Sequence, residues 1–151
     1  MVEYTVKVHD NGDIYWFING KKHREDGPAV EYSHGDREWY LNGVRHREDG
    51  PAIEYVSGTK HWYKNGVCHR EDGPACEFSD GNKYWFLNGK LHREDGPACE
   101  YVNGDIEWHI NGKHLTEEEF LQMTQKHTII IDGQEIQISE ESFNELKKSL
   151  N

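Results

Sequence analysis

The segment HREDGPA recurs every 23 residues, and this repetition constrains the fold more than any other feature of the chain. Its four copies begin at His23, His46, His69 and His92. Each unit reads H-R-E-D-G-P-A-x-E-(Y/F)-x-x-G-x-x-x-W-x-x-N-G-x-x. A fixed period is typical of stacked arrays in which each unit buries its apolar surface against the next. The array is expected over 1–114, with a partial copy at 12–22 and full copies at 23–45, 46–68, 69–91 and 92–114.

Each unit contains two turns that end in glycine. The first turn is variable, for example Ser57-Gly58, and three of its five copies read Asn-Gly or Asp-Gly; the second is always Asn-Gly. These dipeptides favour type I′ hairpins, because that turn needs positive φ at both central positions. We expect strands at 52–55 and 60–64 around the first turn, with Ile53 opposite Trp62.

Alternation along these strands predicts two faces. One face would hold the five tryptophans with Val30, Ile53, Cys76 and Cys99, and would form the core. The other would carry glutamates and a row of rings, each opposite a small alanine and therefore partly accessible. These residues are our first candidates for protein binding: Tyr40, Tyr63, Phe86, His109, Glu31, Glu54, Glu77 and Glu100.

The number of strands per unit follows from the direction of the chain. An odd number of strands would reverse each unit relative to the last, so a regular array prefers two strands per unit. The NGxxHREDGP segment is then a long connection, or a short ribbon that folds against the tryptophan face. The fold class predicted is mainly β, an elongated antiparallel hairpin array.

Both ends of the chain depart from the repeat. The alternating segment 2–9 predicts a capping strand, which would cover the open edge of the array. Thr116 and Glu119 form a capping box for a helix over about 117–126. Strands at 128–131 and 134–138 flank an Asp-Gly turn, and Ser139 begins a last helix. Residues 115–151 are therefore expected to form a small α+β cap, helix–hairpin–helix.

The HREDGPA motif has two interpretations: it forms an active site, or it stabilises the fold. Its base, guanidinium and carboxylates resemble catalytic groups, but catalysis needs convergence on one substrate atom. Four equivalent copies spread along a sheet instead favour architecture, in which carboxylates accept backbone N–H groups and arginines pair across units. A repeated ligand site and catalysis are the alternatives. The ten histidines lack the dense spacing of a zinc site, so no catalytic residue, metal or cofactor is predicted.

If the motif is a scaffold, function should lie where the copies differ. The pair after each Asn-Gly changes freely in charge and size, as in Val44-Arg45 and Val67-Cys68. Arg45 is therefore a further candidate, although drift without selection would give the same variation. The segment 116–151 carries 3 lysines against 8 acidic residues, and it contributes Glu117 and Glu118 as candidates.

Charge and cysteine content bound the partners. The net charge of −11 disfavours direct binding to nucleic acid or anionic membranes and suits a protein with a basic surface, although solubility alone would also explain it. The three cysteines include no CxxC pair and are expected to be reduced. Cys76 and Cys99 should lie roughly 10 Å apart, two strand spacings, which is too far for a disulfide. With no apolar run near 18 residues and no signal-peptide pattern, a cytoplasmic protein is expected.

The phasing W-Y-x-N-G-x-x-H-R-x-x-G-P-A-x-x-Y-x-x-G over residues 11–114 resembles MORN (membrane occupation and recognition nexus) repeats. It is closer to MORN-variant repeats of bacterial antitoxin-like and bacteriophage proteins, in which HREDGPA…WYLNG arrays look alike. The resemblance implies a binding module rather than an enzyme. The acidity departs from the basic face that lipid contact would need.

A non-enzymatic protein-binding module is therefore the function expected. The phage-type resemblance and the acidity suggest an accessory protein that inhibits a host factor, such as a defence nuclease with a basic channel. Sequestering of an anionic nucleotide, or neutralisation of a toxin by an antitoxin or immunity protein, are the alternatives. A homo-oligomer could form through an edge strand or the tryptophan face.

Overall fold

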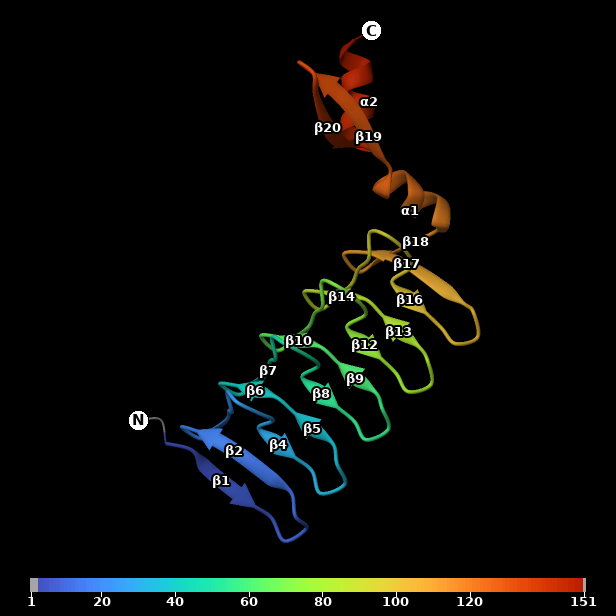
Figure 1. Ribbon diagram of the computed structural model, residues 1–151. Coiled ribbons are helices and arrows are strands. Elements are labelled where there is room, and N and C mark those ends of the chain that lie inside the picture. Colours follow the sequence, from blue (N-terminus) through green and yellow to red (C-terminus); the bar gives the residue numbers. More distant parts are fainter. Residues whose placement is uncertain (1–2, 151) are drawn as a thin grey trace.

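The computed structural model describes residues 3–150 as an elongated, mainly β molecule that ends in two helices (Figure 1). Hairpins follow one another along the molecule, and the first strand and the last helix lie at its opposite ends (Figure 1). Within the described residues, a sheet of 12 strands runs in the order β1-β2-β4-β5-β8-β9-β12-β13-β16-β17-β18, with β3 beside β2. Every pair along this path is antiparallel, so the mainly β hairpin fold is confirmed.

The strands of this sheet are short in the middle and longer at its ends. They are β1 (Thr5–Val8), β2 (Ile14–Ile18), β3 (Lys21–Lys22), β4 (Val30–Glu31), β5 (Arg37–Glu38), β8 (Ile53–Glu54), β9 (Lys60–His61), β12 (Cys76–Glu77), β13 (Lys83–Tyr84), β16 (Cys99–Glu100), β17 (Ile106–Ile110) and β18 (Lys113–Leu115). The predicted capping strand 2–9 is present as β1; its position Val2 lies outside the described residues.

The first turn of each unit is not the type I′ turn that we expected. In the unit at 46–68, the N–H of Gly58 donates to Tyr55 O and the N–H of Tyr55 donates to Thr59 O, both over 2.9 Å. Gly58 has a φ of 94°, and among the described residues of these first turns positive φ is confined to the glycine. This is a type I turn followed by a glycine bulge. The longer loop shifts the register by one residue, so Ile53 pairs with His61 and not with Trp62.

A shift of one residue moves side chains to the opposite face of the sheet. The predicted faces are therefore wrong. Each tryptophan lies on the same face as the glutamates and the buried alanines, and we call this the tryptophan face. The rings do not sit opposite alanines, because Tyr40 pairs with Arg45 and Tyr63 pairs with Cys68.

The opposite face is called the variable face, because its residues differ between units. It carries five kinds of position: Tyr15, Glu38, His61, Tyr84 and Glu107; Phe17, Tyr40, Tyr63, Phe86 and His109; Lys22, Arg45, Cys68, Leu91 and His114; Val30, Ile53, Cys76 and Cys99; Tyr32, Tyr55, Phe78 and Tyr101.

The second turn of each unit is the type I′ turn that its Asn-Gly predicts. Asn65 has a φ of 51° and Gly66 a φ of 82°, and the other Asn-Gly pairs agree. The units at 23–45, 46–68 and 69–91 each have two short strands in the main sheet and two in a ribbon that this turn closes, whereas in the unit at 92–114 all three strands belong to the main sheet. The ribbon strands are β6 (Tyr40–Leu41), β7 (Val44–Arg45), β10 (Tyr63–Lys64), β11 (Val67–Cys68), β14 (Phe86–Leu87) and β15 (Lys90–Leu91).

The NGxxHREDGP segment contains a ribbon, and its HREDGP part lies against the tryptophan face, as one of our alternatives had it, with Arg47 over Trp39. The paired strands of the ribbon reach the variable face. Arg45 of one ribbon lies 3.6 Å from Glu38, and Cys68 of the next lies 3.4 Å from Cys76. Both partners belong to the variable face. The ribbons therefore supply side chains to that face.

The arginine of HREDGPA contacts a tryptophan ring and two carboxylates. The guanidinium of Arg47 lies over the ring of Trp39, 4.1 Å from its centroid. It donates from Nε to Asp49 at 2.9 Å and from Nη1 to Glu54 at 2.9 Å. A Cβ on Gly50 would lie 2.9 Å from the guanidinium carbon, so glycine is needed for the arginine to pack there. The other three copies repeat this arrangement.

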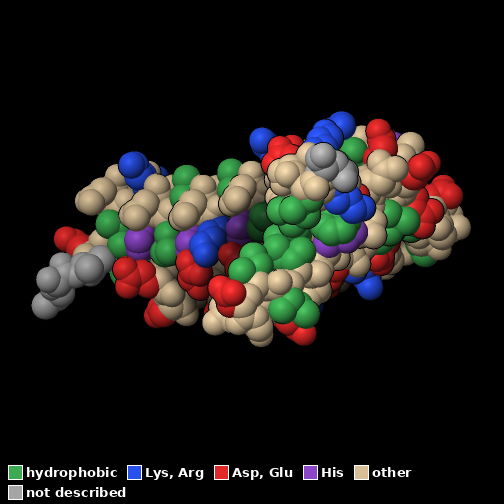
Figure 2. Space-filling model, turned by 90° about the horizontal axis from the view of Figure 1, so that it is seen from above, with side chains coloured by type: hydrophobic (Ala, Val, Ile, Leu, Met, Phe, Trp, Pro, Cys, Tyr) green, Lys and Arg blue, Asp and Glu red, His purple; other side chains and the backbone are tan. Residues whose placement is uncertain are grey.

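The histidine of the motif joins the beginning of each unit to the Asn-Gly turn at the end of the same unit. Nδ1 of His46 accepts the backbone N–H of Asn65 in the following Asn-Gly turn, over 3.1 Å. The same bond recurs in the other copies. Figure 2 shows histidine side chains following one another along the array with carboxylates beside them. The arginine and the histidine of the motif therefore both make contacts that stabilise the fold, which favours the architectural interpretation.

The hairpin tips form a ladder of hydrogen bonds between successive units. Asp36 Oδ1 accepts the backbone N–H of Val56 in the next tip at 2.8 Å. Asp13 serves the tip that follows it in the same way, and Thr59 and Asn82 use neutral oxygens for the same bond. These bonds lower the pKa of the Asp36 carboxyl, because the N–H of Val56 stabilises the charged form.

The C-terminal elements agree closely with those expected. They are α1 (Glu117–Thr124), β19 (Lys126–Ile131), β20 (Gln134–Ser139) and α2 (Glu140–Ser149). Thr116 and Glu119 form the predicted capping box, and Ser139 caps α2. Neither described helix is long and apolar enough to cross a membrane.

Candidate functional site

The variable face is the candidate functional surface, because the arginines and histidines of the motif already bind other residues of the array. A row of aromatic rings crosses this face from unit to unit. Successive rings meet edge to face with centroids 5.8, 5.3, 5.3 and 5.6 Å apart, in the order Tyr55, His61, Phe78, Tyr84 and Tyr101. Edge-to-face pairs stabilise one another, so each ring of the row supports the next. Tyr55 leaves 38% of its surface exposed at one end.

A charged cluster lies on this face near the N-terminal end of the array. Arg45 lies between the rings of Tyr40 and Tyr63, 5.7 and 5.6 Å from their centroids. The hydroxyl of Tyr40 donates to Glu38 at 2.7 Å. Burial, together with this carboxylate, raises the pKa of Tyr40 to about 12. Three of our predicted residues, Arg45, Tyr40 and Tyr63, are thus brought together.

A sulfur cluster follows where the units at 46–68 and 69–91 meet. The sulfurs of Cys68 and Cys76 are 3.4 Å apart, and Nδ1 of His61 lies 3.1 Å from Cys76 Sγ. The contact with Cys68, and next His61, lowers the pKa of the Cys76 thiol to about 6, while Cys76 and burial raise that of Cys68. All three cysteines are free thiols. Our sequence reasoning compared Cys76 only with Cys99 and missed this pair.

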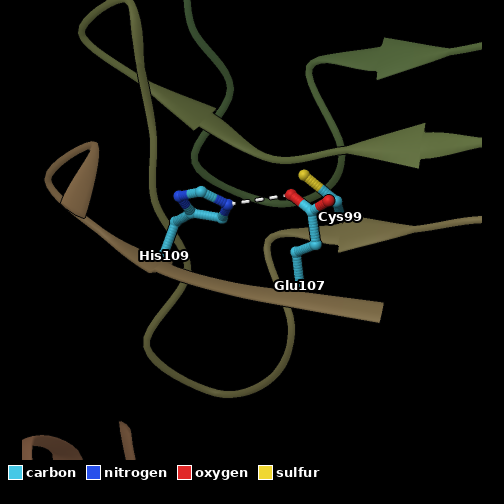
Figure 3. Close-up of side chains that lie close together, drawn as sticks. All are labelled: Cys99, Glu107 and His109. Carbon is cyan, nitrogen blue, oxygen red and sulfur yellow. Dashed lines mark hydrogen bonds and ion pairs between the residues drawn. The ribbon is translucent and has the colours of Figure 1, made fainter. Parts of the chain in front are cut away.

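A third cluster joins a thiol, a carboxylate and an imidazole in the unit at 92–114 (Figure 3). Cys99 on β16 faces Glu107 on β17, and His109 lies two residues further along β17. His109 Nε2 is 3.1 Å from Glu107 Oε2, and the hydroxyl of Tyr101 donates to Glu107 Oε1 at 3.1 Å. His109 lowers the pKa of Glu107, while burial and then Glu107 raise the pKa of the Cys99 thiol to about 11.

The other predicted site residues are divided between the two faces. Phe86 and His109 lie on the variable face, but His109 is buried at 8% exposure and offers no open ring. The glutamates lie on the tryptophan face, each bound to a motif arginine: Glu31, Glu54, Glu77 and Glu100. Glu117 and Glu118 are exposed in the first turn of α1.

Several residues of the clusters escaped the sequence analysis, notably Glu38, His61 and Glu107. Each precedes a tryptophan by one position. The unit alignment already shows that this position varies between tyrosine, glutamate and histidine. The signal was present, but the predicted register put these side chains on the other face.

Hollows between successive HREDGPA loops recur on the tryptophan face. One of them has a volume of about 1090 Å³ and is lined by residues that include Arg70, Glu71, Asp72, Arg93, Glu94 and Asp95. Both arginines are bound to carboxylates of their own loop and sheet. The carboxylates that remain would repel an anion.

No family model matches this chain, and no curated protein matches it.

Proposed function

We propose that the chain is a MORN-like array of 23-residue repeats that binds a protein partner, without catalysis, through its variable face. The row of edge-to-face rings from Tyr55 to Tyr101 is the observation that carries this proposal. Aromatic residues are enriched at protein interfaces and dominate their energetics, because they bury a large rigid area at a small entropic cost.

Charge defines the kind of partner. The net charge of −11 includes a motif glutamate in each unit that stays mostly exposed, such as Glu71 with 75% of its side chain accessible. An acidic surface accelerates association with a basic one and excludes acidic competitors. A basic partner suits a phage-type accessory protein that occupies the nucleic-acid channel of a host defence nuclease. An antitoxin or immunity protein would use the same surface.

Nucleotide sequestering is less well supported by the geometry. An anionic ligand would need free cationic groups in the hollows between the loops. The guanidinium of Arg70 instead lies over Trp62, with Nε bound to Asp72 and Nη1 bound to Glu77. The engaged arginines therefore favour the protein partner over the nucleotide.

Partner capture from a lysate of the source organism tests the proposal. The wild type, Tyr55→Ala and Arg45→Ala would be immobilised and the captured proteins quantified by mass spectrometry at low and high salt. Leu121→Ala is the control, since Leu121 is exposed on α1 and does not belong to the row of rings. A protein held by the wild type and by Leu121→Ala, lost from the two variable-face variants and weakened by salt, is expected. Equal capture by all four proteins would contradict the proposal.

A further inference from the structure

We propose that Cys99, Glu107 and His109 form a binding site for a divalent transition metal, with zinc the ion that fits best. Thiolate, carboxylate and imidazole are the three protein ligands that zinc takes. Their ligand atoms all lie within 4.8 Å of one another. Zinc–ligand bonds of about 2.0–2.3 Å place the ligand atoms of a tetrahedral site roughly 3.3–3.8 Å apart, so only a small contraction would be needed.

The backbone holds the three side chains in place. Cys99 and Glu107 are direct partners across β16 and β17, and Glu107 and His109 are alternate residues of β17. All three side chains therefore project from the same face of the sheet and converge there (Figure 3). Cys99 is 2% exposed and His109 is 8% exposed, so bulk water competes weakly at this site.

The repeat provides an internal comparison. The positions of Cys99, Glu107 and His109 hold Val30, Glu38 and Tyr40 in the unit at 23–45. In the unit at 69–91 they hold Cys76, Tyr84 and Phe86. Three metal-binding side chains coincide only in the unit at 92–114. The array therefore shows which residues these positions take when no such set is formed.

The surroundings of His109 support a metal at its Nε2. Nε2 is the ring nitrogen that lies beside another proposed ligand, 3.1 Å from Glu107 Oε2, so Nε2 would bind the metal and Nδ1 would carry the ring proton. His114 on β18 lies opposite His109 and packs edge to face against its ring, with the centroids 5.0 Å apart. The hydroxyl of Tyr101 holds the other oxygen of Glu107 and so orients the carboxylate, as outer-shell partners of metal ligands do.

A bound cation would also reduce the electrostatic repulsion between the Cys99 thiolate and the Glu107 carboxylate. The Cys99 thiol is buried beside the carboxylate of Glu107, and two anions would repel one another there. A divalent ion between them stabilises both anions, displaces the thiol proton and releases it to solvent. Binding is therefore expected to release protons and to weaken as the pH falls.

Titration of the full chain with Co²⁺ tests the site, because a cobalt–thiolate bond has a charge-transfer absorption. The test variants take the residue found at the equivalent position of another unit: Cys99→Val, as at Val30, and His109→Phe, as at Phe86. The control is Cys68→Leu, as at Leu91, combined with Cys76→Val, which removes the sulfur cluster and keeps the site.

The wild type and the control are expected to bind Co²⁺ with the thiolate band, and Zn²⁺ should displace it and raise the unfolding temperature. Cys99→Val and His109→Phe should lose the band, and Tyr101→Phe should weaken binding roughly tenfold. A band that survives in Cys99→Val but disappears in the control would place the metal at the sulfur cluster and overturn the proposal. Absence of binding by the wild type would overturn it equally. Neither result bears on the protein-binding role, which is measured by capture.

Discussion

The ring of Phe120 lies over the ring of Trp108, with their centroids 4.4 Å apart. The four preceding tryptophans each carry the guanidinium of the next HREDGPA segment in this place, at 4.1 Å. No HREDGPA segment follows Trp108 in the sequence. Helix α1 therefore supplies a phenyl ring where the repeat would have supplied an arginine, and the last tryptophan stays covered.

Replacement of Phe120 tests whether α1 closes the array. Phe120 is 3% exposed, so Phe120→Ala leaves a cavity above Trp108 and should lower the free energy of unfolding by about 3 kcal/mol. Leu121→Ala, in the same helix but 56% exposed, is the control and should change little. Urea unfolding measures both. Equal stability of the two variants would show that α1 does not stabilise the last unit.

Gly73 is expected to be required by Arg70 rather than by its own backbone. A Cβ at Gly73 would lie 2.9 Å from the Arg70 guanidinium carbon, so Gly73→Ala should displace the arginine from Trp62 and destabilise the fold by about 2 kcal/mol. In an Arg70→Ala background the same substitution should cost much less. A double-mutant cycle from denaturant unfolding measures the coupling. Additive effects would mean that the glycine and the arginine act independently.

The two turns of a unit should respond differently to alanine. Asn65 has a φ of 51°, so Asn65→Ala should lose about 1 kcal/mol while Asn65→Gly stays close to the wild type. Ser57 in the first turn should tolerate alanine, since positive φ falls there on Gly58. Thermal unfolding of the three variants compares them. If Ser57→Ala were as unstable as Asn65→Ala, the first turn would be type I′ after all, which would contradict the turn that the structure shows.

The ladder of hairpin tips should depend on pH at Asp36. The N–H of Val56 lowers the pKa of the folded carboxyl below its unfolded value. The stabilisation is therefore present above the unfolded pKa and is lost as the pH falls through the folded pKa. Asp36→Asn, which copies the neutral acceptor Asn82, should show a weaker loss of stability in acid. The free energy of unfolding of the wild type and of Asp36→Asn, measured across the acidic pH range, tests this prediction. Identical pH profiles would show that Asp36 does not contribute to the pH dependence of stability.

The sequence predicted the elements whose signals are local and missed those that depend on strand register. The Asn-Gly turns, the capping box at Thr116 and the last helix from Ser139 follow from short-range chemistry. The predicted type of the first turn was wrong because a type I turn with a bulge and a type I′ turn both place a glycine at this position of the sequence. That one-residue shift exchanged the faces.

The clusters of the candidate site lay further beyond sequence reasoning. His61 and Cys76 are 15 residues apart and meet because β9 pairs with β12 of the next unit. Cys68 reaches them from a ribbon whose position the sequence left open. The variation along the repeat was visible, but which varied residues meet depends on pairing between units.

The most direct test of the account is the stability of the four arginine variants, measured one at a time. If HREDGPA is scaffold, then Arg24→Ala, Arg47→Ala, Arg70→Ala and Arg93→Ala should each lower the free energy of unfolding by about 2 kcal/mol, because each loses a charged hydrogen-bond network and a stacked ring. The exposed Glu71→Gln should change it by less than about 0.5 kcal/mol. Four arginine variants as stable as the wild type would contradict the account, because the motif would then be free for another role.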